Sequence, residues 1–263
     1  MGENSVGNVN TRITGPVTSS DTPDGLTLLF RIEAGLAGRY RLAQMDDYSR
    51  LPRGKLLYRP PVSLTLQARV SDTLLPGTWG FGFWNDPFAL GIGVRGSGVR
   101  LPALPQAAWF FFGSPKNDLS FSSTTPANGL MASVFASRPV PPALLTLGLP
   151  LIPLLLTRNT ARQVRRAAAR FIHDEYAILN HDASQWRAYR LDWLTESVIF
   201  SVDGQVVYTS MASPRSPLGL VIWIDNQFAA FSAEGSVQFG TQENPAPALL
   251  EIRDPVISVP DSL

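Results

Sequence analysis

The only two histidines of this chain both stand beside acids. His173 is followed by Asp174 and Glu175, and His181 is followed by Asp182. An imidazole next to carboxylates can transfer protons near neutral pH, so His173, Asp174 and Glu175 are candidate catalytic residues. Alternatively, they are polar residues at a helix end that precedes the next strand. In a continuous helix the two histidines would be about two turns apart, too far to share an ion, so we expect no metal site.

Two other places set a tryptophan beside an amide and a carboxylate. Asn85 and Asp86 follow Trp84 directly, and the second place runs from Trp223 to Asn226. An indole ring can stack on a sugar while the polar pair binds its hydroxyls, although the same residues are common in turns. The ligand-binding candidates from these two places are Trp84, Asn85, Trp223, Asp225 and Asn226, and Asp86 is also a candidate acid or base.

The stretch Gln185 to Ser210 predicts three consecutive strands. Residues 186–193 alternate with a period of two, which is typical of a strand with two distinct faces. Residues 197–202 are β-branched and aromatic, which favours a half-buried strand. Asp203-Gly204 then predicts a two-residue hairpin turn, because glycine takes a positive φ at no steric cost.

Further runs predict strands along most of the chain. Residues 62–70 alternate cleanly, with one wet side, and Gly80 and Gly82 inside 79–84 indicate a bulge or a close backbone approach. Residues 1–22 are polar and we expect a flexible arm there. We expect residues 23–263 to form a single β-sandwich domain. The other strand predictions are 26–33, 40–44, 107–112, 119–122, 130–136, 218–224, 236–242 and 249–253.

The β pattern breaks between residues 139 and 179. Residues 143–156 are almost wholly apolar, but the run is shorter than the ~20 residues of a bilayer span and contains two prolines. A capping box at Thr160 then opens an amphipathic helix with an apolar stripe of Val164, Ala167, Ala168, Phe171 and Ile172. This insertion could cover a sheet edge, act as a partial lid on a cleft, or contact an anionic membrane surface through 141–172.

Composition excludes several classes of function. The chain has 22 basic and 21 acidic residues, which argues against a general nucleic-acid binder. It contains no cysteine and hence no disulfide framework. Its first residues lack a signal-peptide pattern, so we expect a cytoplasmic location. Neither a cofactor nor an oligomeric state is indicated.

The motifs of two strands resemble those of a known family. The pattern Trp186, Tyr189, Trp193 and then Val202-Asp203-Gly204 is similar to that of laminarinase-type glycoside hydrolases, glycoside hydrolase family 16. The run Pro76 to Trp84 resembles the Gly-Phe-Trp strand of the same family. The resemblance implies a concanavalin A-like lectin/glucanase fold, that is, a jelly-roll sandwich, and covers about residues 60–253.

The catalytic acids of that family have no counterpart in this sequence. The family places them as Glu-x-Asp-x-Glu on the strand after the Gly-Phe-Trp element, and here that strand is 107–112, Ala-Ala-Trp-Phe-Phe-Phe. Trp109 and Phe111 share one face, and Phe110 and Phe112 share the other. Either the strand is simply buried core, or half of its rings line a pocket for an apolar or amphiphilic ligand.

The fold class that we predict is therefore all-β: an antiparallel sandwich with one helical insertion around 143–179. The leading functional hypothesis is a non-hydrolytic protein that binds an apolar or carbohydrate-bearing small molecule in a concave, aromatic cleft. The alternatives are an enzyme that acts on a hydrophobic or glycosidic substrate through His173 and nearby carboxylates, and an interaction protein that docks through the apolar hairpin 141–156. Further ligand-binding candidates are Trp109, Phe111, Trp186 and Arg190.

Overall fold

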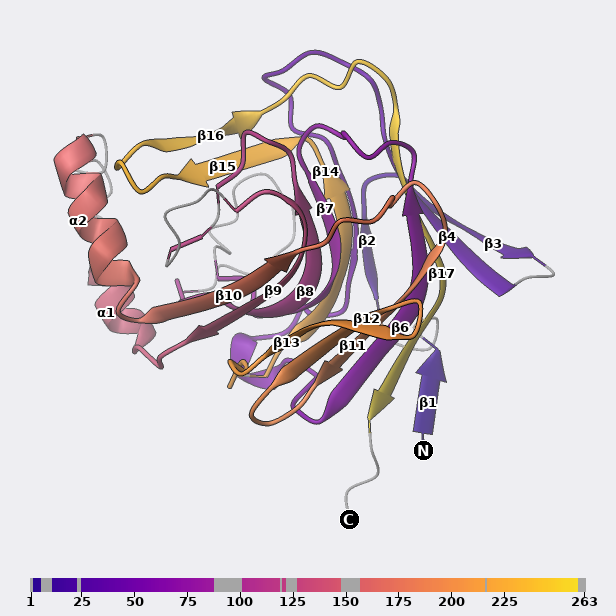
Figure 1. Cartoon of the computed structure of the whole chain (residues 1–263), viewed down its shortest axis with the longest axis horizontal. Helices are drawn as coiled ribbons and strands as arrows, with labels where there is room; N and C mark the ends of the chain where they lie inside the picture. The colour runs from indigo at the N-terminus through magenta and orange to yellow at the C-terminus, as the bar shows by residue number, and fades with distance from the viewer. Residues whose placement is uncertain are drawn as a thin grey trace.

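Two antiparallel sheets packed face to face make up most of the molecule (Figure 1). The computed structural model describes residues 2–5, 11–22, 25–87, 101–118, 120–121, 127–147, 157–215 and 217–259. The predicted all-β sandwich is confirmed, because the described strands of both sheets pair antiparallel with their neighbours and the described α-helices lie in one segment.

One sheet, which we call the back sheet, contains the three strands of the 185–210 stretch. Asp203 and Gly204 form the predicted hairpin turn, and both have positive φ, 50° and 79°. Strand β1 pairs with β17 at the margin of this sheet. The sheet order is β13 (Gln205–Ser210), β12 (Val198–Val202), β11 (Arg187–Trp193), β6 (Val62–Val70), β17 (Ala248–Val259), β4 (Gly25–Ile32) and β3 (Val17–Thr22), with β1 (Gly2–Ser5) beside β17.

The other sheet, the front sheet, is strongly curved, and its concave side faces away from the back sheet (Figure 1). A two-stranded hairpin, β15 (Gln227–Phe231) and β16 (Val237–Thr241), extends from the end of β14 over this concave side. The front sheet runs in the order β10 (Ile172–Ile178), β9 (Gly129–Ser137), β8 (Gln106–Gly113), β7 (Thr78–Trp84), β14 (Gly219–Asp225), β5 (Leu42–Asp46) and β2 (Arg12–Thr14).

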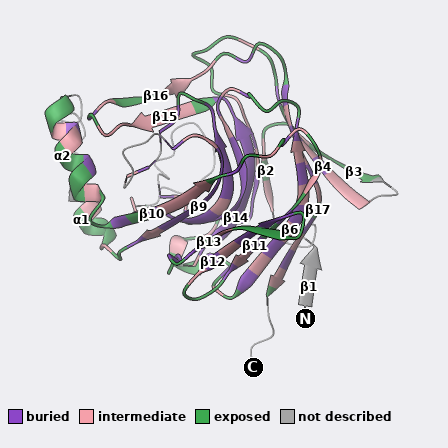
Figure 2. Cartoon of the chain, in the orientation of Figure 1, coloured by how far each residue is buried: buried purple, intermediate pink, exposed green. Residues whose placement is uncertain are grey.

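The main core lies between the two sheets. On β6 the alternation is strict: residues 62, 64, 66, 68 and 70 are buried and those between them are half-exposed. The front-sheet strands differ, because β8 and β14 are buried along nearly their whole length (Figure 2). A strand buried on both faces needs a second layer of atoms over its far side. The concave face of the front sheet therefore carries its own apolar clusters, separate from the core of the sandwich.

The helical insertion is shorter than predicted and turns a different side inward. It contains α1 (Pro142–Leu147) and α2 (Arg158–Ala168), and the chain then enters strand β10 rather than staying helical to residue 179. Helix α2 buries Ala161 and Arg165. The predicted apolar stripe is wrong as the buried side, because Val164 and Phe171 are exposed. Residues 148–156 of the apolar run lie outside the described part of the chain.

The amino-terminal region also differs from the prediction of a flexible arm. Strand β2 pairs with β5 at one edge of the front sheet, and β3 pairs with β4 at one edge of the back sheet. Its polar residues suit edge strands, where one side meets water. A short 3-10 helix, Arg53–Lys55, lies between β5 and β6. Among the described residues, no helix is long and apolar enough to cross a membrane.

Candidate functional site

The rings of strand β8 divide between two environments. Phe110 and Phe112 point into the core between the sheets. Trp109 and Phe111 point the other way, onto the concave face, where they join separate apolar clusters. In the resembled family this strand carries the catalytic acids. Here the residues of this strand on the concave side are Ala107, Trp109 and Phe111. The strand therefore presents aromatic rings to that side instead of carboxylates.

Neighbouring strands extend this surface into what we call the aromatic floor. The Trp109 ring centroid lies 5.3 Å from that of Trp223 and 5.7 Å from that of Trp84. It also lies 5.5 Å from Phe111 and 6.3 Å from Phe135. Rings at such separations attract each other beyond their simple area of contact. Tyr48 joins at one side, with its ring 5.8 Å from that of Trp84.

Two glycines of β7 make room for the indoles. Gly80 and Gly82 occupy concave-side positions opposite Phe111 and Trp109 in the register with β8. A Cβ added to Gly80 would lie 2.7 Å from the Trp223 ring, and one added to Gly82 would lie 2.6 Å from Cβ of Trp109. The close approach indicated by the glycines in the sequence is therefore an approach of the β8 backbone, at the Phe110 and Ala108 carbonyls, together with the two tryptophan side chains.

Two indole nitrogens of the floor lack a hydrogen-bond partner in the part of the chain that the structure describes. Nε1 of Trp84 and Nε1 of Trp109 are both buried without an acceptor among the described residues. Trp223 differs, because its Nε1 donates to Oγ1 of Thr78 at 2.9 Å. Trp79, in the sandwich core, is also unpartnered. A buried N–H without an acceptor costs free energy, and an acceptor on a ligand would remove that cost.

Three described carboxylates stand on the strands with their side chains on the concave side, and each is already bound by the protein. Asp174 accepts hydrogen bonds from Oγ of Ser120 at 2.7 Å and from the Phe121 N–H. Asp46 accepts from the Ser49 N–H at 2.8 Å. These two lie on β10 and β5, five strand spacings apart, which is roughly 24 Å.

Asp225 is the third of these acids and is fully buried at the end of β14. Burial raises its pKa to about 6, although hydrogen bonds from Thr78, Gln227 and Tyr40 work in the opposite direction. Oδ1 accepts from Thr78 Oγ1 at 2.8 Å, and Oδ2 accepts from the Tyr40 hydroxyl at 3.2 Å. Counting strands and residues along the sheet puts Asp225 roughly 14 Å from Asp46 and roughly 28 Å from Asp174.

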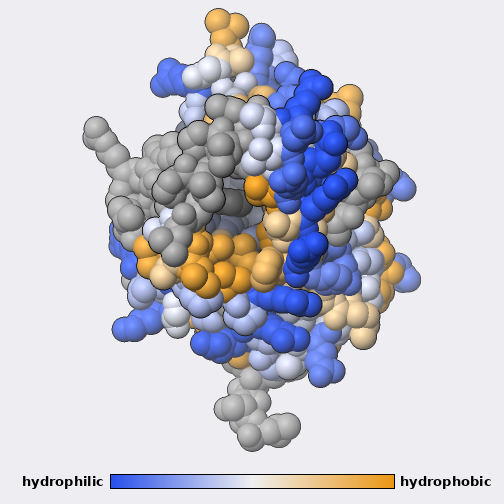
Figure 3. All heavy atoms as spheres, turned by 90° about the vertical axis from the view of Figure 1, so that its left-hand side faces the viewer, coloured by the Kyte–Doolittle hydropathy of each residue, from blue (hydrophilic) through white to orange (hydrophobic). Residues whose placement is uncertain are grey.

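Other segments cover the floor. Arg165 of α2 is buried and donates from Nε to the Phe231 carbonyl at 3.0 Å and from Nη2 to the Ser120 carbonyl at 2.9 Å. It thereby joins the helix both to the β15–β16 hairpin and to the loop held by Asp174. On this side of the molecule a hydrophilic column stands at the position of α2 beside apolar atoms, and the surface between them is hollowed (Figure 3).

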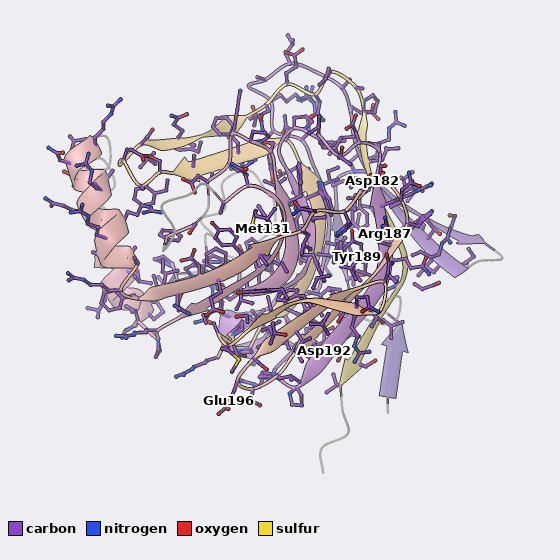
Figure 4. All side chains as sticks on the ribbon, viewed as in Figure 1. Met131, Asp182, Arg187, Tyr189, Asp192 and Glu196 are labelled. Carbon is purple, nitrogen blue, oxygen red and sulfur yellow. The ribbon has the colours of Figure 1, made fainter. Side chains whose placement is uncertain are left out.

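Little free space remains directly above the rings. The described cavity there measures about 10 Å³. Its lining includes Trp109, Phe111, Phe135, Asp174 and Tyr176. Met131 belongs to the same lining and lies within the curve of the front sheet (Figure 4). A drug-sized ligand needs several hundred cubic ångströms. Binding on the floor therefore requires displacement of part of the cover.

Several candidates from the sequence hold loops in place. Both polar groups of the Asn85 side chain bind backbone, with Nδ2 donating to the Leu104 carbonyl and Oδ1 accepting from the Gln106 N–H. Asn226 accepts from the Arg41 N–H and donates to two carbonyls. Asp86, in a left-handed conformation, gives its carbonyl to Arg53 Nη2 at 2.6 Å.

Two candidates are not on the concave face at all. Trp186 lies beside the back sheet, with its ring between the guanidinium groups of Arg69 and Arg253 at 4.8 and 4.4 Å. Arg190 lies on the same outer side and forms a bidentate pair with Asp192, with both contacts at 2.7 Å. The structure therefore separates these two residues from Trp84, Trp109, Phe111 and Trp223.

The His173 cluster is split by its strand. Because β10 alternates, Asp174 points to the concave side, while His173 and Glu175 point toward the back sheet. Nε2 of His173 lies 2.9 Å from Oε1 of Glu175, and Oγ of Ser210 donates to Oε2 of Glu175 at 2.6 Å. Burial alone would raise the pKa of Glu175, but the hydrogen bonds from Ser210 and His173 lower it below its ordinary value.

His173 borders a second cavity, which we call the edge cavity. This edge cavity measures about 680 Å³ and opens where the margins of the two sheets meet. Sequence reasoning found His173 but missed the other charged groups of the lining: Arg138, Arg170, Arg215 and Glu196. They come from four separate segments, so no local spacing could have signalled them.

Comparisons with known proteins support the fold only. No protein-family model and no curated protein matches the chain. A Bacillus licheniformis β-glucanase has 11% identity and a TM-score of 0.44, covering 97% of this chain and 95% of that one. A prokaryotic β-1,3-1,4-glucanase (lichenase) derived from a mouse hindgut metagenome has 12% identity and a TM-score of 0.42, covering 88% and 78%.

The binding domain of botulinum neurotoxin DC, solved in complex with rat synaptotagmin II, has 9% identity and a TM-score of 0.43. The match covers 95% of this chain, but the chain spans only 43% of the length of that protein. Glucanases are thus among the solved structures to which this chain is similar. At these identities the likeness concerns architecture and not activity.

Proposed function

We propose that this protein binds an apolar or glycosylated small molecule on the aromatic floor and does not hydrolyse glycosides. The observation that carries the proposal is the pair of buried indole N–H groups of Trp84 and Trp109, neither of which has an acceptor among the described residues. A ligand that lies on the rings with a hydroxyl, ether or carbonyl oxygen turned toward β7 and β8 would satisfy both donors. Its apolar part would replace the covering atoms in contact with the floor.

The positions of the acids support the non-hydrolytic part. Glycoside hydrolysis needs two carboxyl groups about 5 to 9.5 Å apart around the scissile bond. Counted along the sheet, the three described acids on the concave side of the front-sheet strands are roughly 14 to 28 Å apart. Each of them also accepts hydrogen bonds from the protein. Neither their spacing nor their availability suits acid/base cleavage of a sugar bound on the floor.

The cover acts as a partial lid in this proposal. Since the free space above the rings is about 10 Å³, a ligand enters only when the segments joined through Arg165 move outward. Closure over the bound molecule would then exclude water from both indoles. This assigns α2 a gating role rather than a purely structural one.

Equilibrium titration with two neutral probes tests the proposal. Nile red represents an apolar ligand and a β-glucan hexasaccharide a glycosylated one, with dye fluorescence and calorimetry as readouts. We expect at least one probe to bind, and Trp109→Ala to weaken its binding at least tenfold because a stacking surface is lost. Trp186→Ala is the matched control, since that ring lies beside the back sheet and its loss should leave the affinity unchanged.

Two results would overturn the proposal. One is the absence of binding of either probe at millimolar concentration to protein with a native melting transition. The other is equal weakening by Trp109→Ala and Trp186→Ala, which would mean that the probe does not distinguish the floor from a ring on the outer side of the back sheet. Release of reducing sugar from the hexasaccharide would contradict the non-hydrolytic part alone.

A second candidate function is acid/base catalysis at the edge cavity. It is favoured by one observation, the 2.9 Å contact that holds Nε2 of His173 against Glu175 while the ring lines a cavity of about 680 Å³. With Nε2–H donating to the carboxylate, Nδ1 would be free to accept a proton from a substrate or a water.

Turnover assays with and without His173→Gln test this second function. The substrates to screen are activated carboxylic and phosphate esters, whose cleavage gives a coloured phenolate. We expect a rate that rises with histidine deprotonation and that falls at least a hundredfold in the variant. A rate unchanged by His173→Gln would exclude this histidine as the base.

A further inference from the structure

The edge cavity gathers positive charge from segments far apart in the sequence. Arg138 follows β9, Arg170 follows α2, and Arg215 follows the β13 strand by five residues. The lining of the edge cavity also includes Ala136, Ala212 and Ser213. The turn between β11 and β12, where Glu196 is labelled in Figure 4, forms one wall.

None of the three guanidinium groups is neutralised within the described part of the chain. The ion pairs found there involve arginines 31, 69, 187 and 190, and none of them lines the cavity. The side chains of Arg138, Arg170 and Arg215 also make no hydrogen bond to a described residue. Glu196, the one acid in the lining, is likewise unpaired and exposed.

This arrangement contrasts with the arginines elsewhere in the protein. Arg69, Arg187 and Arg190 each have a carboxylate within 3 Å, and Arg165 is held by carbonyl oxygens. Three unpaired cations around one concavity repel each other, and the repulsion is relieved when an anion occupies the space between them. The planar guanidinium group suits carboxylate and phosphate because it donates two parallel hydrogen bonds.

The rim of the edge cavity adds one more hydrogen-bond donor and two exposed apolar side chains. His173 is 62% exposed by side chain, and its ring is oriented by Glu175, so a protonated imidazole could donate from Nδ1 into the cavity. Phe171 is 45% exposed and Met211 is 76% exposed, and both line the same space. An anion attached to an apolar group would therefore find complementary contacts at both ends.

We propose that the edge cavity is a binding site for an oxyanion, the carboxylate or phosphate group of a small molecule, held by Arg138, Arg170 and Arg215. This site is independent of the aromatic floor, because His173 and Asp174 point to opposite sides of β10. The proposal also does not depend on proton transfer by His173. The cavity volume of about 680 Å³ accommodates a ligand much larger than the anion itself.

Titration of the full chain with inorganic phosphate and with hexyl phosphate tests the site. We expect phosphate to bind in the millimolar range and hexyl phosphate to bind about tenfold more tightly, because Phe171 and Met211 contact its chain. Binding should weaken as ionic strength rises, since the guanidinium groups are exposed to screening. Isothermal titration calorimetry gives both affinities.

A third probe separates a free anion from a lipid headgroup. Vesicles of neutral phosphatidylcholine, with and without 20% phosphatidate, are mixed with the protein and pelleted. If the protein pellets only with vesicles that contain phosphatidate, and the arginine variants described below do not pellet, the oxyanion is the headgroup of a membrane lipid. Binding of the soluble phosphates without pelleting would assign it to a small molecule.

Substitutions at exposed, unpaired arginines should leave the fold intact. Arg138→Gln, Arg170→Gln and Arg215→Gln are each expected to weaken hexyl phosphate binding about tenfold, since each removes a charge-assisted hydrogen bond. The matched control is Arg166→Gln, an exposed arginine of α2 outside the cavity lining. Equal affinity in the triple variant and the native chain, equal losses in the control, or no binding of any of the probes would overturn the proposal.

Discussion

The two faces of strand β8 carry the same kind of side chain but differ in what surrounds them. Phe110 is fully buried among Phe81, Tyr189 and Phe200, in a core that both sheets close. Trp109, one residue earlier, is half-buried among other indoles and has a nitrogen without an acceptor. The core face of β8 is fully packed by the protein itself. On the concave face, Nε1 of Trp109 lacks a hydrogen-bond acceptor among the described residues.

This difference separates stability from function within one strand. Apolar surface removed from water on the core side stabilises the fold whether or not a ligand exists. On the concave side the same chemistry leaves polar atoms unsatisfied, which is the kind of defect that a binding partner corrects. Substitutions on the core face should therefore mainly lower the free energy of unfolding. Substitutions on the aromatic floor should mainly weaken ligand binding.

The largest expected effect is that of Phe110→Ala. Removal of a fully buried ring leaves a cavity in the main core, so we expect the free energy of unfolding to fall by about 3–5 kcal/mol. Trp109→Ala removes a larger ring but from a half-buried position, and should cost less, about 1–2 kcal/mol. Denaturant unfolding followed by circular dichroism measures both. A greater loss for Trp109→Ala would mean that the floor, too, is a structural core.

The acid that anchors the end of the floor gives the second effect. Since the pKa of Asp225 is about 6 when folded and 3.8 ordinarily, its contribution to stability is full below about pH 4 and is lost as pH rises to about 6. A pKa difference of about two corresponds to roughly 3 kcal/mol. Asp225→Asn lacks this dependence, so the stability of the native chain relative to the variant should fall by that amount between pH 4 and pH 7.5.

Asp203 supplies the control for this pH prediction. Hydrogen bonds from the Ala188 N–H and from Arg187 lower the pKa of this exposed acid, so its contribution has the opposite sign and is lost as pH falls. Asp203→Asn should therefore lower the stability at pH 7.5 more than at pH 3. A pH profile that is the same for Asp225→Asn and the native chain would show that Asp225 titrates normally.

Loosening the cover should give an intermediate effect. Arg165→Met keeps the length of the side chain but leaves the Phe231 and Ser120 carbonyls without their donor, which should cost about 1–3 kcal/mol. Amide hydrogen exchange should increase in α2 and in β15–β16 but not in β6. Nile red should also associate faster, because the lid opens more often. Arg166→Met, on the exposed side of α2, should change neither rate.

The smallest expected effects are those of replacing indole by phenyl. Trp84→Phe and Trp109→Phe each remove a buried N–H that has no acceptor among the described residues, which stabilises the fold, but each also removes part of a packed ring. The two effects oppose each other, so the stability should change by no more than about 0.5 kcal/mol. Trp223→Phe should cost more, about 1 kcal/mol, since it breaks the bond to Thr78. Thermal unfolding measures the set. A loss of 2 kcal/mol for Trp109→Phe would indicate an acceptor that the floor already possesses.

Period-two alternation was enough to predict much of the fold. It identified β6 and β11 and the pairing of the rings on β8, and the Asp203-Gly204 turn followed from the sterics of positive φ. The same rule failed for His173, Asp174 and Glu175. Their adjacency suggests a single cluster, but adjacency in a strand puts neighbouring side chains on opposite faces. Reading 172–178 as a strand would have separated them.

Long-range contacts explain what the sequence could not supply. Trp186 and Trp109 look equivalent in the sequence, but the former is enclosed by Arg69 and Arg253, which meet it only because β6 and β17 are neighbours. Helix α2 buries Arg165 instead of its apolar stripe because two carbonyls from distant loops converge on that guanidinium. The edge cavity likewise depends on the meeting of both sheet margins, which no local pattern encodes.

Nuclear magnetic resonance of the six tryptophan indole groups tests the central claim most directly. The signals are assigned by single Trp→Phe variants and followed during titration with whichever neutral probe binds. The account predicts that the indole proton signals of Trp84 and Trp109 move downfield as they gain an acceptor, while that of Trp79, unpartnered but enclosed in the core, stays in place. Saturable binding that leaves the Trp84 and Trp109 signals unmoved would contradict it.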